Sequence, residues 1–142
     1  MDQSGRRAAR EQAFALLFEL SFYPEGSLRD ILDAHGAQED EIPELNALAL
    51  KLALCAEEHL QALDEEIAKR LKGWKLSRIS RASHAILRLA VCEMKYFDDI
   101  PVGASINEAV ELAKIYADDD APKFINGVLG AIARAENADT GN

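Results

Sequence analysis

The sequence contains only two cysteines, Cys55 and Cys92, and they lack the Cys-x-x-Cys spacing of a metal or redox site. Both lie within helical patterns, so we expect two buried, reduced thiols and a cytoplasmic protein. Long apolar runs are also missing. No window approaches the ~20 apolar residues of a membrane span, and no apolar stretch follows the first arginines as in a signal peptide. We therefore expect no membrane span and no signal peptide.

Residues that favour turns and strands are scarce, with 8 glycines and 4 prolines among 142 residues and few β-branched runs. Alanine and leucine dominate instead, which favours helices. The apolar content of 49% and charged content of 29% are typical of a globular protein. At this length we expect one domain with an all-α fold, which buries roughly 68–70% of its unfolded surface.

Catalytic motifs are absent as well. His35, His59 and His84 are far apart, and none has metal-ligand spacing with another histidine or cysteine. The sequence has no P-loop, no dinucleotide-binding glycine pattern, no nucleophile elbow and no paired histidines of a zinc protease. We therefore expect no catalytic residue, no metal and no cofactor, and we interpret the protein as non-enzymatic.

The net charge of −9 is unevenly distributed along the chain. Residues 67–92 carry seven basic side chains and no carboxylate, and the first 12 residues add Arg6, Arg7 and Arg10. Two short basic segments in an acidic chain permit a local positive field despite the overall sign. The alternative is that the basic side chains lie on a solvent-exposed helix face and are neutralised by nearby acidic side chains.

The first helix, expected from Arg6 to about Phe22, has an apolar arc wider than one packed face requires. Either it is enclosed on two sides, or one stripe faces a partner. Since Arg6, Arg7 and Arg10 share this arc and are not buried unpaired, we expect the first turns to project beyond the core as a basic arm. One stripe consists of Ala13, Leu16, Leu17 and Leu20, and the adjacent one of Phe14, Phe18 and Phe22.

Local signals predict the remaining helices. In the helix expected to end before Pro101, Glu93 lies within the apolar arc. Because a carboxylate there needs donors, we interpret it as a buried structural acceptor. The first half of the chain is expected to continue with a helix from Ser27 to about His35, a loop from Gly36 to Ile42, and a long helix from Pro43 to Leu71 stopped by Gly73. A helical turn over 74–79 and a helix capped by Ser80 or Ser83, which ends before Pro101, are expected next. The last two expected helices are one opened by the capping-box pair Ser105 and Glu108 and one that follows Asp118–Asp120.

Several of these segments resemble the NusB family of transcription antitermination factors. The resemblance runs through nearly the whole chain in order, although residues 23–66 match only in helical character. The matching segments are Arg6–Glu11, Trp74–Ile79, Ala85–Ala90 with Glu93, Asp99–Pro101, Ile106–Lys114 and Lys123–Leu129.

The resemblance implies an all-α fold of about seven helices in two packed three-helix bundles. On this basis we expect a single RNA-binding domain over residues 1–142. Its expected parts are a basic arm at 1–12, an N-terminal bundle at 13–72, a C-terminal bundle at 73–136 and a frayed polar tail at 137–142.

The resemblance also implies a role. NusB-like proteins bind the single-stranded boxA element of ribosomal RNA leaders together with ribosomal protein NusE, in the RNA polymerase antitermination complex. Carried over by position, the residues expected to bind RNA are Arg6, Arg7, Arg10, Arg88, Asp120, Lys123 and Phe124, and those expected to face NusE are Phe18 and Ser83.

Some points stay open at this stage. Phe124 is either a stacking platform for a base or part of the core, and Phe18 is either core or partner-facing. The chain departs from the family at Leu71, where some relatives place an aromatic near the RNA, and at Ser83-His84, which replaces a frequently charged pair. The alternative function is a helical protein–protein adaptor, or a homodimer, without RNA binding.

Overall fold

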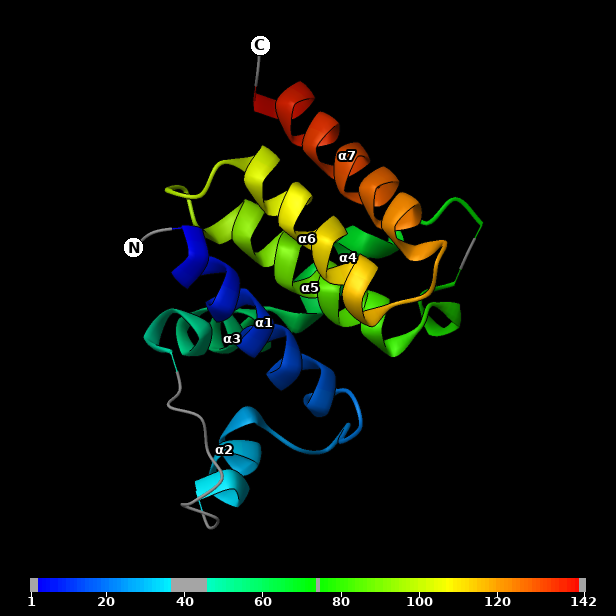
Figure 1. Ribbon diagram of the computed structural model, residues 1–142. Helices are drawn as coiled ribbons and strands as arrows, with labels where there is room; N and C mark the ends of the chain where they lie inside the picture. Colours follow the sequence, from blue (N-terminus) through cyan, green and yellow to red (C-terminus); the bar gives the residue numbers. More distant parts are fainter. Residues whose placement is uncertain (1–2, 37–45, 74, 141–142) are drawn as a thin grey trace.

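The computed structural model of the chain describes residues 3–36, 46–73 and 75–140. These residues form seven α-helices and one short 3-10 helix and contain no strand, which confirms the predicted all-α class (Figure 1). The α-helices are α1 (Gln3–Leu20), α2 (Leu28–Gly36), α3 (Ala47–Glu58), α4 (Leu60–Ala68), α5 (Arg81–Tyr96), α6 (Val102–Tyr116) and α7 (Ala121–Thr140), and the 3-10 helix is η2 (Leu76–Arg78).

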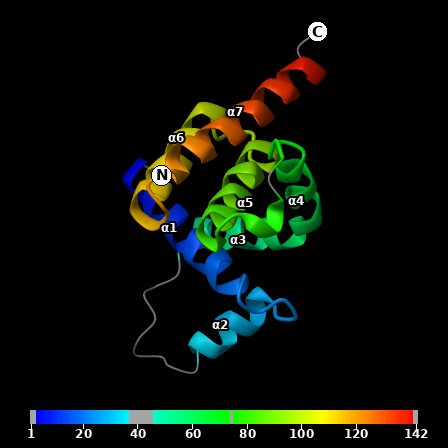
Figure 2. The ribbon, with the colours of Figure 1, turned by 90° about the vertical axis from the view of Figure 1, so that its right-hand side faces the viewer.

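Helix α5 is the centre of the fold. It packs against α1, α3, α4, α6 and α7, and it lies between α1 and α3 on one side and α6 and α7 on the other (Figures 1 and 2). Helices α5, α6 and α7 contact one another as one bundle, and α1, α2 and α3 contact one another as a second. The two packed three-helix bundles are thus as predicted. The segment boundaries at 12/13, 72/73 and 136/137 stay predictions.

The starts of α2 and α5 follow the capping signals read from the sequence. The Ser27 hydroxyl accepts from the Asp30 N–H at 3.2 Å while the Asp30 carboxylate accepts from the Ser27 N–H, a reciprocal capping box for α2. Ser80 caps α5 by accepting from the Ser83 N–H at 3.0 Å. Gly73 has a φ of +91°, in the left-handed region that glycine occupies without strain, and it follows the end of α4.

The long helix expected from Pro43 to Leu71 is wrong, because the chain breaks at His59 between α3 and α4. His59 has φ −114° and ψ 19°, its Nδ1 lies 2.9 Å from the Cys55 carbonyl oxygen, and its ring stacks on Tyr96 at 4.0 Å between centroids. This tertiary contact with α5 outweighs the helical pattern of the sequence. Pro43, the loop from residue 37 to 42 and Trp74 lie outside the described residues.

The apolar arc of α5, with Ile86, Leu89, Ala90 and Met94, is buried in the core, as is Cys92. Burial raises the pKa of the Cys92 thiol, so it stays protonated. Cys55 is only half-buried, and neither cysteine forms a disulfide. At the other end of the fold, α7 extends to Thr140, so residues 137–140 of the expected frayed tail are helical. No helix in the described part of the chain is both long and apolar enough to cross a membrane.

Candidate nucleic-acid interface

The start of α1 carries the first group of candidate residues. Arg7 donates from Nε and Nη2 to the two carboxylate oxygens of Glu108 on α6, at 3.1 and 2.9 Å. The Arg7 side chain is 53% exposed, whereas that of Glu108 is 6% exposed. Arg6, one residue earlier, is half-buried. Hydrogen bonds from Arg7 lower the pKa of the Glu108 carboxyl, against a smaller opposing effect of burial.

Arg10 does not project beyond the core, which corrects the expectation made for the start of α1. It is 5% exposed, and its Nε and Nη2 donate to Glu93 of α5 at 2.9–3.0 Å. Glu93 is 1% exposed and also accepts from the Ser105 hydroxyl at 2.9 Å. A buried arginine is tolerated here because a buried carboxylate neutralises it. The prediction that Glu93 is a buried acceptor is confirmed.

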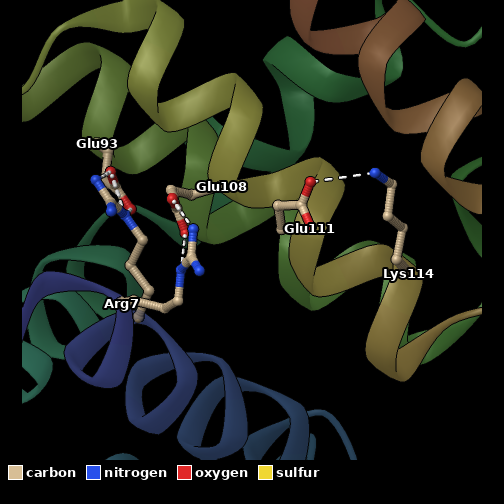
Figure 3. Close-up of polar contacts among 6 residues, drawn as sticks. Arg7, Glu93, Glu108, Glu111 and Lys114 are labelled. Atoms are coloured by element: carbon tan, nitrogen blue, oxygen red, sulfur yellow. Dashed lines mark hydrogen bonds and ion pairs between the residues drawn. The ribbon is translucent and has the colours of Figure 1, made fainter. Parts of the chain in front are cut away.

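The sequence analysis gave Glu108 the role of a helix-capping residue, whereas in the structure it pairs with Arg7. The capping box expected for Ser105 and Glu108 is wrong, because α6 begins one turn earlier, with Pro101 as its N-cap and the Pro101 carbonyl accepting from the Ser105 N–H at 3.1 Å. Both side chains therefore lie on the inner face of α6, where Ser105 donates to Glu93 and Glu108 accepts from Arg7. Figure 3 shows the contact between Glu108 and Arg7. The sequence signal that was available is a carboxylate on the same helical face as the buried residues Leu112 and Ser105.

Arg88 lies on another side of α5, bound to α4. It donates from Nε and Nη2 to the Asp64 carboxylate at 2.9 and 2.7 Å, and the His84 Nε2 lies 2.7 Å from the same carboxylate. Burial favours a higher pKa for Asp64, but the hydrogen bonds from Arg88 and His84 outweigh it and lower this pKa to about 2. Asp64 was not singled out from the sequence, because its partners lie 20 and 24 residues away.

Ser83, Asp120 and Phe124 come together around one hollow of about 270 Å³ between η2, the start of α5 and the start of α7. Ser83 is buried, Phe124 is half-buried against the core, and Asp120 is exposed. Phe124 therefore both contacts the core and lines a solvent-open hollow, and its stacking on a base stays a prediction. Lys123 is exposed beside it on α7.

A larger groove of about 960 Å³ adjoins this hollow, and the two share Ile79 and Ser80 in their walls. His84 and Arg88 line the groove from α5, together with the turn that follows α1. Ser83, Arg88, Asp120 and Phe124 thus border one continuous concave region. Arg10 binds α5 at Glu93, ten residues beyond Ser83, which is about 15 Å along the helix. The candidate residues therefore fall into two separate groups.

Two phenylalanines of α1, and Phe22 in the turn that follows it, show a gradient of burial. Phe14 is buried and packs against Tyr116 of α6 at 4.9 Å between ring centroids, Phe18 is half-buried, and Phe22 is 50% exposed. Phe18 stacks on Phe14 at 5.8 Å and meets the edge of Phe22 at 5.2 Å. The wide apolar arc is thus enclosed at one end and open at the other. The guanidinium of Arg81 covers the open end, 4.5 Å from the Phe22 centroid.

Comparison with known proteins identifies what this arrangement resembles. The sequence model of the NusB family matches residues 7–134. The transcription antitermination protein NusB of Carboxydothermus hydrogenoformans is 44% identical over 133 residues, which are 90% of this chain and 92% of that protein.

Solved structures agree with this match. The NusB of T. maritima superposes with a TM-score of 0.79 at 33% identity, covering 91% of this chain and 90% of that one. A crystal structure of antitermination factors NusB and NusE in complex with dsRNA matches with a TM-score of 0.79 at 30% identity, covering 94% of this chain and 99% of that one. The likeness therefore extends over the whole fold.

Proposed function

The chain belongs to the NusB family, and on that basis we propose that it is a transcription antitermination factor that binds RNA together with ribosomal protein NusE. The observation that carries the proposal is the match, over 94% of this chain, to a structure of NusB and NusE in complex with dsRNA. Its RNA ligand is the boxA-type element of ribosomal RNA leaders. The protein works without catalysis, in the cytoplasm, as part of the RNA polymerase antitermination complex.

Exposure and pairing suggest different tasks for the basic candidates. Arg6, Arg7 and Lys123 bind RNA phosphates, since their side chains reach solvent. Arg10 and Arg88 act indirectly, because each guanidinium already binds a carboxylate and leaving it would strand a buried or half-buried charge.

The hollow beside Phe124 receives an unstacked base. The half-buried ring lines the hollow, and an aromatic face stacks on a base of any identity. Asp120 on the rim accepts from base-edge donors and repels a phosphate that is out of register. NusE covers Phe18 and the exposed Phe22, and it contacts the start of α5 close to Ser83, whose own side chain is buried.

The exposed Phe22, at the end of the row of phenylalanines, also supports a second candidate function. In it the protein is a helical adaptor or a homodimer, and its exposed arginines interact with solvent and not with RNA. Exposed aromatic side chains, such as Phe22 and Tyr116, are typical of protein interfaces whatever the partner. Sedimentation velocity of the protein alone measures self-association directly. This second candidate predicts a dimer at micromolar concentration and no salt-sensitive RNA binding.

The test is fluorescence anisotropy of a labelled single-stranded boxA-type RNA, with and without NusE, at two salt concentrations. Competitors are a scrambled single strand and a duplex of the same sequence. We expect binding that tightens with NusE, weakens with salt and falls for the scrambled strand. Arg6→Ala should weaken binding, whereas Arg29→Ala, an exposed arginine on the peripheral helix α2, is the matched control. Absence of binding both with and without NusE refutes the proposal.

A further inference from the structure

The carboxylate of Glu108 occupies one edge of the Arg7 guanidinium. It accepts from Nε and Nη2 at 3.1 and 2.9 Å, a two-point contact that sets the plane and direction of the guanidinium. Nη1 makes no hydrogen bond within the described residues and belongs to a side chain that is 53% exposed. One edge of Arg7 therefore faces the protein, and the other remains for a ligand.

This pair is built to persist. The Glu108 side chain is 6% exposed, and the donors it has in the described part of the chain both belong to Arg7. If Arg7 turned its inner edge towards a phosphate, Glu108 would be left as a nearly buried charge without a partner, which is strongly unfavourable. The neighbouring carboxylate on α6, Glu111, is instead paired with Lys114 at 3.1 Å (Figure 3).

The charges at the start of α1 are consequently compensated. Glu108 neutralises Arg7 and Glu93 neutralises Arg10, which leaves Arg6 as the arginine of this group without a carboxylate partner among the described residues. A neutralised arginine attracts polyanions weakly at a distance but still donates directional hydrogen bonds on contact.

We infer that Glu108 is a positioning residue for RNA binding, which orients Arg7 towards one phosphate and cancels its general attraction for RNA. The inference rests on the proposed function. Glu108 then serves discrimination: a correctly placed phosphate meets the outer edge of Arg7, while an RNA in another register gains little from its charge.

The test is RNA binding by Glu108→Gln, with Glu111→Gln as the matched control. Both variants remove one negative charge from α6, but Glu111 does not hold Arg7. We expect Glu108→Gln to steepen the slope of log affinity against log salt by about 0.7, the value for one phosphate of a single strand neutralised by a charge that Glu108 no longer compensates. We also expect it to bind the scrambled RNA more tightly, so that discrimination between the two RNAs falls severalfold. Glu111→Gln should leave both quantities unchanged.

Arg7→Lys gives a second test that does not depend on the stability of the first variant. Lysine keeps the charge at an exposed position but lacks the planar two-edged donor group, so discrimination should fall while the salt slope is retained. If Glu108→Gln is folded by its thermal transition and matches wild type in slope and discrimination, or if Arg7→Lys discriminates like wild type, the inference is wrong. If wild type itself binds no RNA with NusE present, the proposed function has failed instead.

Discussion

Replacing Arg10 by methionine removes the main partner of a buried carboxylate without leaving a large cavity. Arg10 and Glu93 are 5% and 1% exposed, and three hydrogen bonds of 2.9–3.0 Å join them, so both charges are almost fully desolvated. Breaking such a pair from one side typically costs about 3–5 kcal/mol of unfolding free energy. For a domain of this size, that corresponds to a fall of about 10–20 °C in Tm.

The double variant Arg10→Met/Glu93→Leu distinguishes this cause from simple loss of packing. Replacing both charges by apolar side chains of similar size removes the stranded carboxylate, and such replacements are often neutral or stabilising. We therefore expect the double variant to recover most of the lost stability. Ser105 loses its acceptor in this variant, which limits the recovery by about 1 kcal/mol.

Urea unfolding followed by circular dichroism measures the stability of the four proteins of this double-mutant cycle, which are wild type, Arg10→Met, Glu93→Leu and the double variant. Two results would refute the reasoning: a cost below about 1 kcal/mol for Arg10→Met, or additive costs in the double variant. RNA binding of the double variant adds a functional arm. Because Arg10 is held inside the fold, RNA affinity should change less in the double variant than in Arg6→Ala.

Three further predictions concern Asp64, Phe124 and Lys123. The Asp64 pKa is lowered to about 2, below the unfolded value near 4, so its contribution to stability is fully present above about pH 5 and is lost as the pH falls through 2. Asp64→Asn should remove that pH dependence. It should lower the unfolding free energy by roughly 1 kcal/mol near neutral pH, a small value because the site is partly open to solvent. Equal acid sensitivity of wild type and variant in urea titrations would contradict this prediction. Phe124→Ala should weaken boxA-type RNA binding about 5- to 150-fold, which is the loss of one stacked base, and unchanged affinity in the anisotropy assay would exclude the stacking role. Lys123→Ala should mainly reduce the slope of log affinity against log salt.

Much of the fold could be predicted because the signals are local. Ser27 and Ser80 act on backbone groups within three residues, so the starts of α2 and α5 could be predicted, whereas the start expected for α6 at Ser105 was wrong. The buried stripe of α5 likewise follows from spacing along one helix. Where a tertiary contact competed with a local signal, the local prediction failed: stacking of His59 on Tyr96 accompanies a break in a helix that its own pattern would continue.

The candidate site could be predicted only in part. The resemblance to the family indicated which positions to examine, yet it did not say which of the arginines reach solvent. Glu93 was recognised as a buried acceptor and Arg10 as a residue that cannot be buried alone, but nothing in the sequence linked the two, because 83 residues separate them. The same holds for Arg7 and Glu108, which are 101 residues apart.

The sequence by itself determined the helical class, the ends of several helices and the uneven distribution of charge, because each depends on composition or on contacts within a turn or two of helix. Only the tertiary structure decided which cations are free and which are paired. That choice depends on how α1, α5 and α6 meet in space, where a carboxylate on one helix is brought within 3 Å of an arginine on another. The desolvation of such pairs, rather than the residue types alone, separates the buried Arg10 from Arg6, the candidate that we propose as an RNA ligand.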